Sequence, residues 1–143
     1  MKRKRLIKAD GFTLLEALFA VILIGLGVVS LVAASGAFTV ANSAGLDIST
    51  AEFLIEEIRE MTASIPFENL AALDGQTYSP PVDVTQISLN DFANFTQQIM
   101  AQNVSATDLT TPQSGSDFIR MEVTILKNGL PVNSASWIRA NIN

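Results

Sequence analysis

The chain has 143 residues, 48% of them hydrophobic, and it contains neither histidine nor cysteine. Five of its nine basic residues precede residue 11, so the remainder carries four basic side chains against thirteen acidic ones, a balance of −9. An acidic chain of this kind offers no basic surface for nucleic acid. Without histidine or cysteine, no motif assembles an acid–base or nucleophilic site. We therefore expect one small domain besides any membrane segment, no enzyme, no cofactor and no nucleic-acid partner.

A strongly basic start precedes a long apolar run. Residues 17–40 contain no charged side chain. Residues 14–40 would form a helix of about 40 Å, which is enough to cross a hydrocarbon core of about 30 Å with some tilt. The positive flank predicts a cytoplasmic N-terminus, with everything after about residue 42 on the other side of the membrane.

Between the basic start and the apolar run, residues 11–16 read GFTLLE. This arrangement resembles the class III signal of type IV prepilins and pseudopilins, in which a short basic leader ends in glycine before such a start. The resemblance implies that a prepilin peptidase cuts between Gly11 and Phe12 and methylates the new amino group of Phe12. An ordinary secretory signal is cut after its apolar region, whereas here the apolar helix would stay in the product.

The acidic residue at the head of the apolar run, Glu16, needs a physical reason. A charge within the membrane costs on the order of 2.5–3.5 kcal/mol. Cleavage would create an α-amine on Phe12 with a pKa of about 7.7–8.0, one helical turn before the acid. The partner of Glu16 would be this amine or, in a staggered fibre, the amine of a neighbouring subunit. The alternative is an ordinary signal anchor whose acid simply reaches the interface.

The predicted helix continues beyond the membrane as an amphipathic segment. No proline occurs before Pro66, which is expected to end a helix of about 50 residues. Phe53 falls on the side away from the apolar stripe, where it would meet a neighbouring subunit or a loop. The stripe itself is predicted to bury against the rest of the domain, and it consists of Ala51, Leu54, Ile55, Ile58, Met61 and Ile65.

After Pro66 the composition changes to turn-forming and β-forming residues. Residues 66–93 are predicted to be a long connecting loop with one short element near residues 84–89, and residues 95–104 a strand. Residues 105–117 form a second polar stretch. Asp108 and Asp117 flank it and could bind calcium, although solvated loop acids are the better interpretation because calcium needs six to eight oxygen ligands.

The end of the chain predicts a β-hairpin. Apolar and polar residues alternate from residue 119 to residue 125, and Asn128-Gly129 is the dipeptide favoured by a two-residue type I′ turn. Counting outward from that turn pairs Lys127 with Leu130. On the core side the count then places Ile125 opposite Val132, Met121 opposite Ser136 and Ile119 opposite Ile138.

The same count places Trp137 beside Arg120 on the face away from the core. That face would be used by a cation–π contact or by a subunit contact. The alternative is a bulge near Pro131 that reverses the alternation and buries the ring.

The expected fold is α+β and pilin-like: a long N-terminal helix whose outer half packs on a small antiparallel sheet of at least three strands. Residues 1–11 would be the leader, 12–41 the transmembrane and assembly helix, and 42–143 the extracytoplasmic globular domain. The resemblance implies a minor pilin in the bacterial inner membrane and then in a type IV pilus, with the peptidase and other pilin subunits as partners. The alternatives are a minor pseudopilin of type II secretion and a membrane-anchored binding domain that never polymerises.

Overall fold

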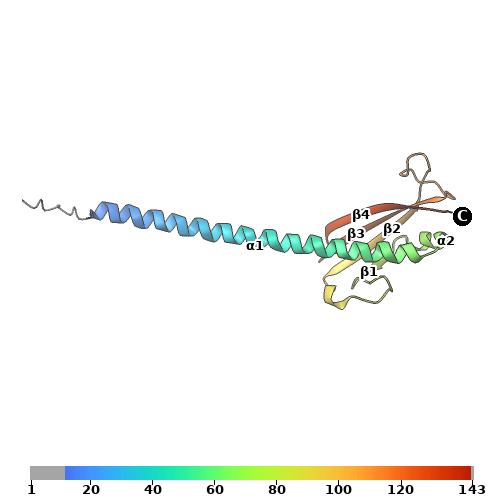
Figure 1. Ribbon diagram of the computed structural model, residues 1–143, viewed down its shortest axis with the longest axis horizontal. Helices are drawn as coiled ribbons and strands as arrows, with labels where there is room; N and C mark the ends of the chain where they lie inside the picture. Colours follow the sequence, from blue (N-terminus) through green and yellow to red (C-terminus); the bar gives the residue numbers. More distant parts are fainter. Residues whose placement is uncertain (1–11, 143) are drawn as a thin grey trace, which may run out of the picture. The chain divides into compact units, whose positions relative to one another are not determined.

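The computed structural model describes residues 12–142, which comprise one long helix and a small sheet with its connections (Figure 1). Two compact units are distinguished, Met1–Ser43 and Ala44–Asn143, and the helix α1 (Leu14–Ser64) runs through the boundary between them. As predicted, α1 is a single helix of 51 residues that ends just before Pro66. The proline cannot continue the helical hydrogen bonding and disfavours helical geometry in the residue before it.

The first thirty residues of α1 expose apolar side chains all round the helix. This stretch is long and apolar enough to cross a membrane, and its position near the N-terminus fits either a single membrane span or a signal sequence. A helix that is apolar on every face is stable only when lipid or protein surrounds it.

The second unit contains a four-stranded antiparallel sheet whose strands lie side by side in chain order. They are β1 (Thr77–Tyr78), β2 (Phe95–Asn103), β3 (Phe118–Lys127) and β4 (Leu130–Ala140). The predicted α+β class is therefore confirmed. The segment predicted as a long loop is more structured than expected, because it holds two short helical turns, a helix of one turn and the two-residue strand β1. The helix of one turn is α2 (Phe67–Leu70), and the two helical turns are η1 (Ala71–Leu73) and η2 (Asn90–Phe92).

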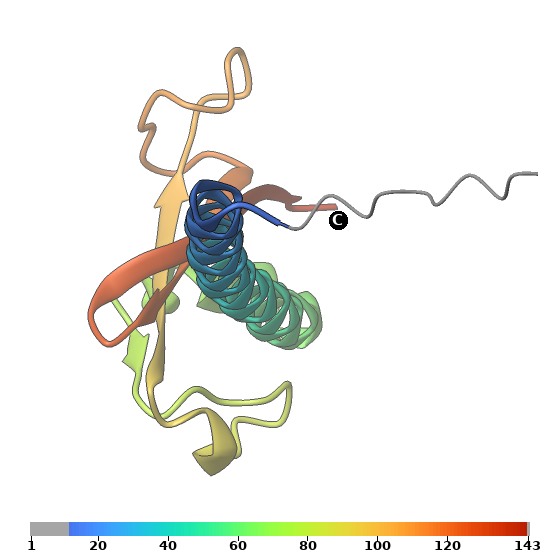
Figure 2. The ribbon, with the colours of Figure 1, turned by 90° about the vertical axis from the view of Figure 1, so that its left-hand side faces the viewer.

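The C-terminal part of α1 lies across one face of this sheet (Figure 2). The predicted stripe is buried from Ala51 to Met61, and Ile65 at its end is half-buried. Alternate residues of β2 and β3 face the helix and complete the core, because successive side chains of a strand point to opposite faces. These buried strand residues are Phe95, Ile99, Ala101, Ile119, Met121, Val123 and Ile125.

The predicted hairpin is present, but its register beyond the turn was predicted incorrectly. Asn128 and Gly129 both adopt positive φ, at 51° and 81°, as a type I′ turn requires, and Lys127 pairs with Leu130 as expected. An irregularity between Ile125 and Leu126 then places Ile125 opposite Asn133 instead of Val132. This bulge adds one residue to β4 and reverses the facing of every residue after it.

The bulge places Trp137 on the core side, opposite Met121, as the alternative prediction had it, but the residue is only partly buried. In the observed register Arg120 pairs with Ile138, where Trp137 was expected. Ile119 pairs with Arg139, where Ile138 was expected. A cation–π contact does occur, but its cation is the guanidinium of Arg59 on α1, which lies 5.1 Å from the indole centroid. The contact therefore joins the helix to β4.

Phe53, which lies outside the buried stripe of α1, meets a loop of its own chain. Its ring centroid lies 5.8 Å from that of Phe92, and 44% of the residue remains exposed. Nearby, the backbone N–H of Val84 donates a 2.8 Å hydrogen bond to the Glu57 carboxylate. The segment that connects α2 to β2 thus contacts α1 through a ring pair and a hydrogen bond.

Candidate functional site

The candidate site is the start of α1. Gly11, the residue before the expected cleavage point, lies outside the described residues, as does the basic segment that precedes it. Phe12, the residue expected to be methylated, is 82% exposed and precedes the helix. Glu16 lies in the first turn of α1 and is also exposed.

Thr13 and Glu16 cap the helix reciprocally. The Thr13 hydroxyl oxygen accepts a hydrogen bond from the Glu16 N–H at 3.3 Å, and the Glu16 carboxylate accepts from the Thr13 N–H at 3.5 Å and from its hydroxyl at 3.4 Å. The first helical bond runs from the Ala17 N–H to the Thr13 carbonyl. This is a capping box, in which a threonine at the N-cap and a glutamate three residues later satisfy each other's backbone N–H.

The capping box supplies a second physical reason for an acid at this position. An N-cap of this kind stabilises a helix by about 0.5–2 kcal/mol, and a negative charge in the first turn also opposes the helix dipole. Sequence reasoning missed this role, although the spacing Thr-x-x-Glu was its signal. Cleavage after Gly11 would leave the new amine on the residue directly before Thr13, so the same turn would hold the cap and the amine.

The polar loop between β2 and β3 uses its carboxylates for its own structure. Asp108 accepts hydrogen bonds from the Thr111 hydroxyl and from the N–H groups of Thr110 and Thr111. The Thr111 hydroxyl contributes most and the two N–H groups add to it, and together they lower the pKa of Asp108 to about 2. Asp117 accepts from the Asn141 amide at 3.3 Å. Among residues 12–142 no three acidic side chains gather as a metal site would require.

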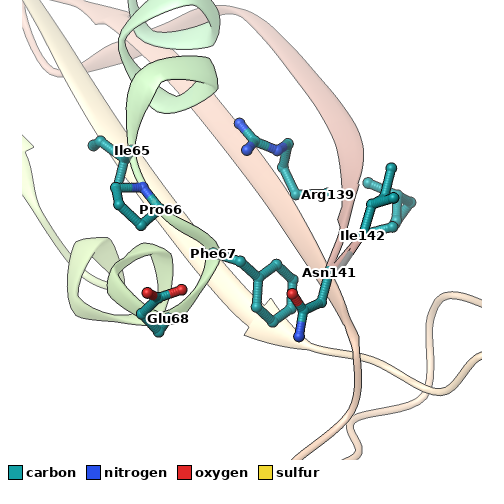
Figure 3. A pocket seen from close by; sticks show the side chains of 9 residues that line it. Ile65, Pro66, Phe67, Glu68, Arg139, Asn141 and Ile142 are labelled. Atoms are coloured by element: carbon teal, nitrogen blue, oxygen red, sulfur yellow. The ribbon is translucent and has the colours of Figure 1, made fainter.

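A hollow of about 680 Å³ opens at the C-terminal end of α1. The lining includes Phe67 and Glu68 at the start of α2, Arg139 near the end of β4, and Asn141 just after that strand (Figure 3). The Arg139 guanidinium donates a hydrogen bond to the carbonyl of Thr62 in the last turn of the helix. The last turn carries no basic residue of its own, so Arg139 supplies the cation that the negative end of the helix dipole favours.

Known proteins provide no further identification, since no protein-family model, curated protein or solved structure matches this chain.

Proposed function

We propose that this protein is a structural subunit, a minor pilin, which a prepilin peptidase processes at Gly11 and which is then incorporated into a type IV pilus. The proposal rests mainly on α1. One continuous helix carries an apolar surface that is exposed all round near its start, and it packs its last turns on a sheet of the same chain. An apolar helix of this kind can lie in lipid first and among other helices later.

The sequence before the helix supports the processing step and the topology. The basic leader would hold the N-terminus in the cytoplasm, so the sheet would be extracytoplasmic in the bacterial inner membrane. The peptidase and neighbouring pilin subunits are the partners proposed, and the protein is a substrate of an enzyme instead of an enzyme itself. The missing cysteines and the short globular part favour a minor subunit, because the disulfide-bounded C-terminal loop common in major pilins of the Gram-negative type IVa group has no counterpart here.

Processing is tested with Gly11→Val. The peptidase is expected to need a small residue before the apolar helix, so the variant should keep residues 1–11 while still inserting into the membrane. Intact-mass measurement of the protein purified from membranes reads the outcome. Removal of the leader from this variant would contradict the proposed processing site.

Incorporation is tested with two variants that separate the charge of Glu16 from its capping role. Glu16→Gln removes the charge but keeps a side chain that serves in a capping box. Thr13→Ala removes the cap and leaves the carboxylate in place. If charge pairing drives assembly, mature protein should appear in membranes for both variants, while the amount in sheared fibres falls much further for Glu16→Gln.

Other results would show that Glu16 serves only to cap the start of the helix. Equal losses for the two variants, or normal incorporation of Glu16→Gln, would remove the pairing role. A wild-type chain that keeps its leader and never appears in sheared fibres would instead identify a membrane-anchored domain that does not polymerise.

A further inference from the structure

The strand β4 is an edge of the sheet, with β3 as its neighbour on one side only. It is 11 residues long, and residues 130–138 carry no charge. Natural sheets protect long edges with charged side chains, prolines, bulges or a covering segment. In β4 such protection lies at the two ends of the strand, with Pro131 and the bulge beside it at the start and Arg139 near the end, so residues 132–138 are unprotected.

The backbone groups that face away from β3 follow from the register. In an antiparallel pair only alternate residues exchange hydrogen bonds with the neighbouring strand. The Ser134 N–H donates a 2.9 Å hydrogen bond to the side-chain oxygen of Asn133, and it therefore points away from β3. The alternation then places the N–H and carbonyl groups of Ser136 and Ile138 on the same outer edge.

A groove of about 630 Å³ lies beside this edge, between β4 and α1 in the second unit. Asn133, Ser134 and Ala135 form its strand side, and its helix side includes Glu52 and Glu56. Both glutamates are exposed, and Glu56 forms an ion pair with Arg59 at 2.8 Å. Apolar atoms are also present, because Phe53 and Ile55 line the same groove.

We propose that the β4 edge binds an extended segment of a partner protein as a fifth strand of the sheet. The free N–H and carbonyl groups of Ser136 and Ile138 would pair with the backbone of the segment, as in other cases of strand addition. Alternate side chains of an added strand point to the helix side of the sheet. Those side chains would be basic, because Glu52 and Glu56 form the wall that they meet.

A second copy of this chain fits the edge less well. After Gly11 each copy carries a side-chain balance of −9, so two copies repel each other. The opposite edge of the sheet is β1, whose two residues are too few to match β4. The inference concerns a surface of the second unit and does not depend on processing or incorporation into a fibre.

The probe is a fluorescent eight-residue peptide with lysine at every second position and threonine or valine at the positions between. It is added to the full chain in a nonionic detergent. Its acidic counterpart has glutamate in place of lysine. We expect the basic peptide to bind at least tenfold more tightly than the acidic one by fluorescence anisotropy. Hydrogen exchange measured by NMR should slow at the amides of Ser136 and Ile138 when the basic peptide is present.

Two pairs of variants separate strand pairing from general attraction to an acidic protein. Ser136→Pro removes an N–H on the outer edge, where a sheet tolerates proline, and Ser136→Ala keeps it. Glu52→Gln removes a charge from the groove, and Glu60→Gln removes one from an exposed position of α1 that does not line it. Binding should fall at least tenfold for Ser136→Pro and severalfold for Glu52→Gln, with little change for the two controls.

The exchange measurement on the unchanged protein keeps the test decisive even if Ser136→Pro does not fold. No binding of the basic peptide, or binding without slower exchange at Ser136 and Ile138, would overturn the proposal. Dimers that protect these amides in the absence of any peptide would also overturn it, because a second copy would then occupy the edge.

Discussion

The side chain of Gln97 is the main polar connection inside the core, and its removal gives the sharpest test of the packing. Gln97 lies on β2 and is fully buried. Its amide oxygen accepts from the Val82 N–H at 2.8 Å, and its amide nitrogen donates to the carbonyls of Leu54 at 3.0 Å and Val82 at 3.1 Å. One side chain therefore joins α1, the connecting segment and the sheet.

Gln97→Leu keeps the approximate size of the side chain and removes all three hydrogen bonds. The Val82 N–H then stays buried without a partner, which costs about 1–3 kcal/mol. The Leu54 carbonyl is affected less, because it lies within a helix and keeps its bond to the N–H four residues later. For a domain of this size, each kcal/mol corresponds to a fall of roughly 4–8 °C in the melting temperature.

The assay is the unfolding of the full chain by heat and by urea in nonionic detergent. The fluorescence of Trp137, the one tryptophan of the chain, monitors both transitions. The matched control is Gln98→Leu, the same chemical change at the neighbouring residue, which is exposed on the other face of β2. The control should change the free energy of unfolding by no more than about 0.5 kcal/mol. If Gln97→Leu were as stable as the control, the buried amide would not hold the three elements together.

Three further outcomes follow from the contacts described above. Arg139→Met should lower the free energy of unfolding by about 1–2 kcal/mol, because the Thr62 carbonyl loses its hydrogen-bond donor and the C-terminal end of the helix loses a nearby cation. Arg139→Lys should recover part of this loss in the same unfolding assay. The pKa of Asp108 is about 2 in the folded chain and about 3.9 when unfolded, so its contribution to stability is present above pH 4 and lost as the pH falls towards 2. An acid titration of unfolding should therefore be steeper for the wild type than for Asp108→Asn, and equal slopes would contradict the role of the Thr111 hydrogen bonds. A fragment of residues 66–143 lacks the helix that covers the sheet and should show no cooperative melting by circular dichroism, whereas a cooperative transition would show that the sheet is stable alone.

Local signals predicted most of the secondary structure. The absence of proline before Pro66 gave the length of α1, and the stripe from Ala51 to Met61 gave its buried face. Asn128-Gly129 gave the turn of the hairpin. Each of these signals depends on residues within a few positions of one another, because helix ends, helix faces and tight turns are decided by local backbone geometry.

The details of the candidate sites could be predicted less well. The capping box of Thr13 and Glu16 was readable from its spacing but was not recognised. The outer edge of β4 depends on the order of the strands and on the bulge, neither of which is written in any short segment. The β4 residues that face the helix were therefore misassigned.

The sequence by itself determined that an apolar helix leads into an acidic α+β domain. It also determined the residue before which that helix ends and the two residues that form the turn of the final hairpin. Only the tertiary structure decided that Trp137 packs under Arg59 and that Gln97 is a buried connection. The physical reason is that side chains of a strand alternate with a period of two, so one inserted residue reverses all that follow. Contacts such as that between Gln97 and Leu54 join residues 43 positions apart, and they form only when the helix and the sheet have packed together.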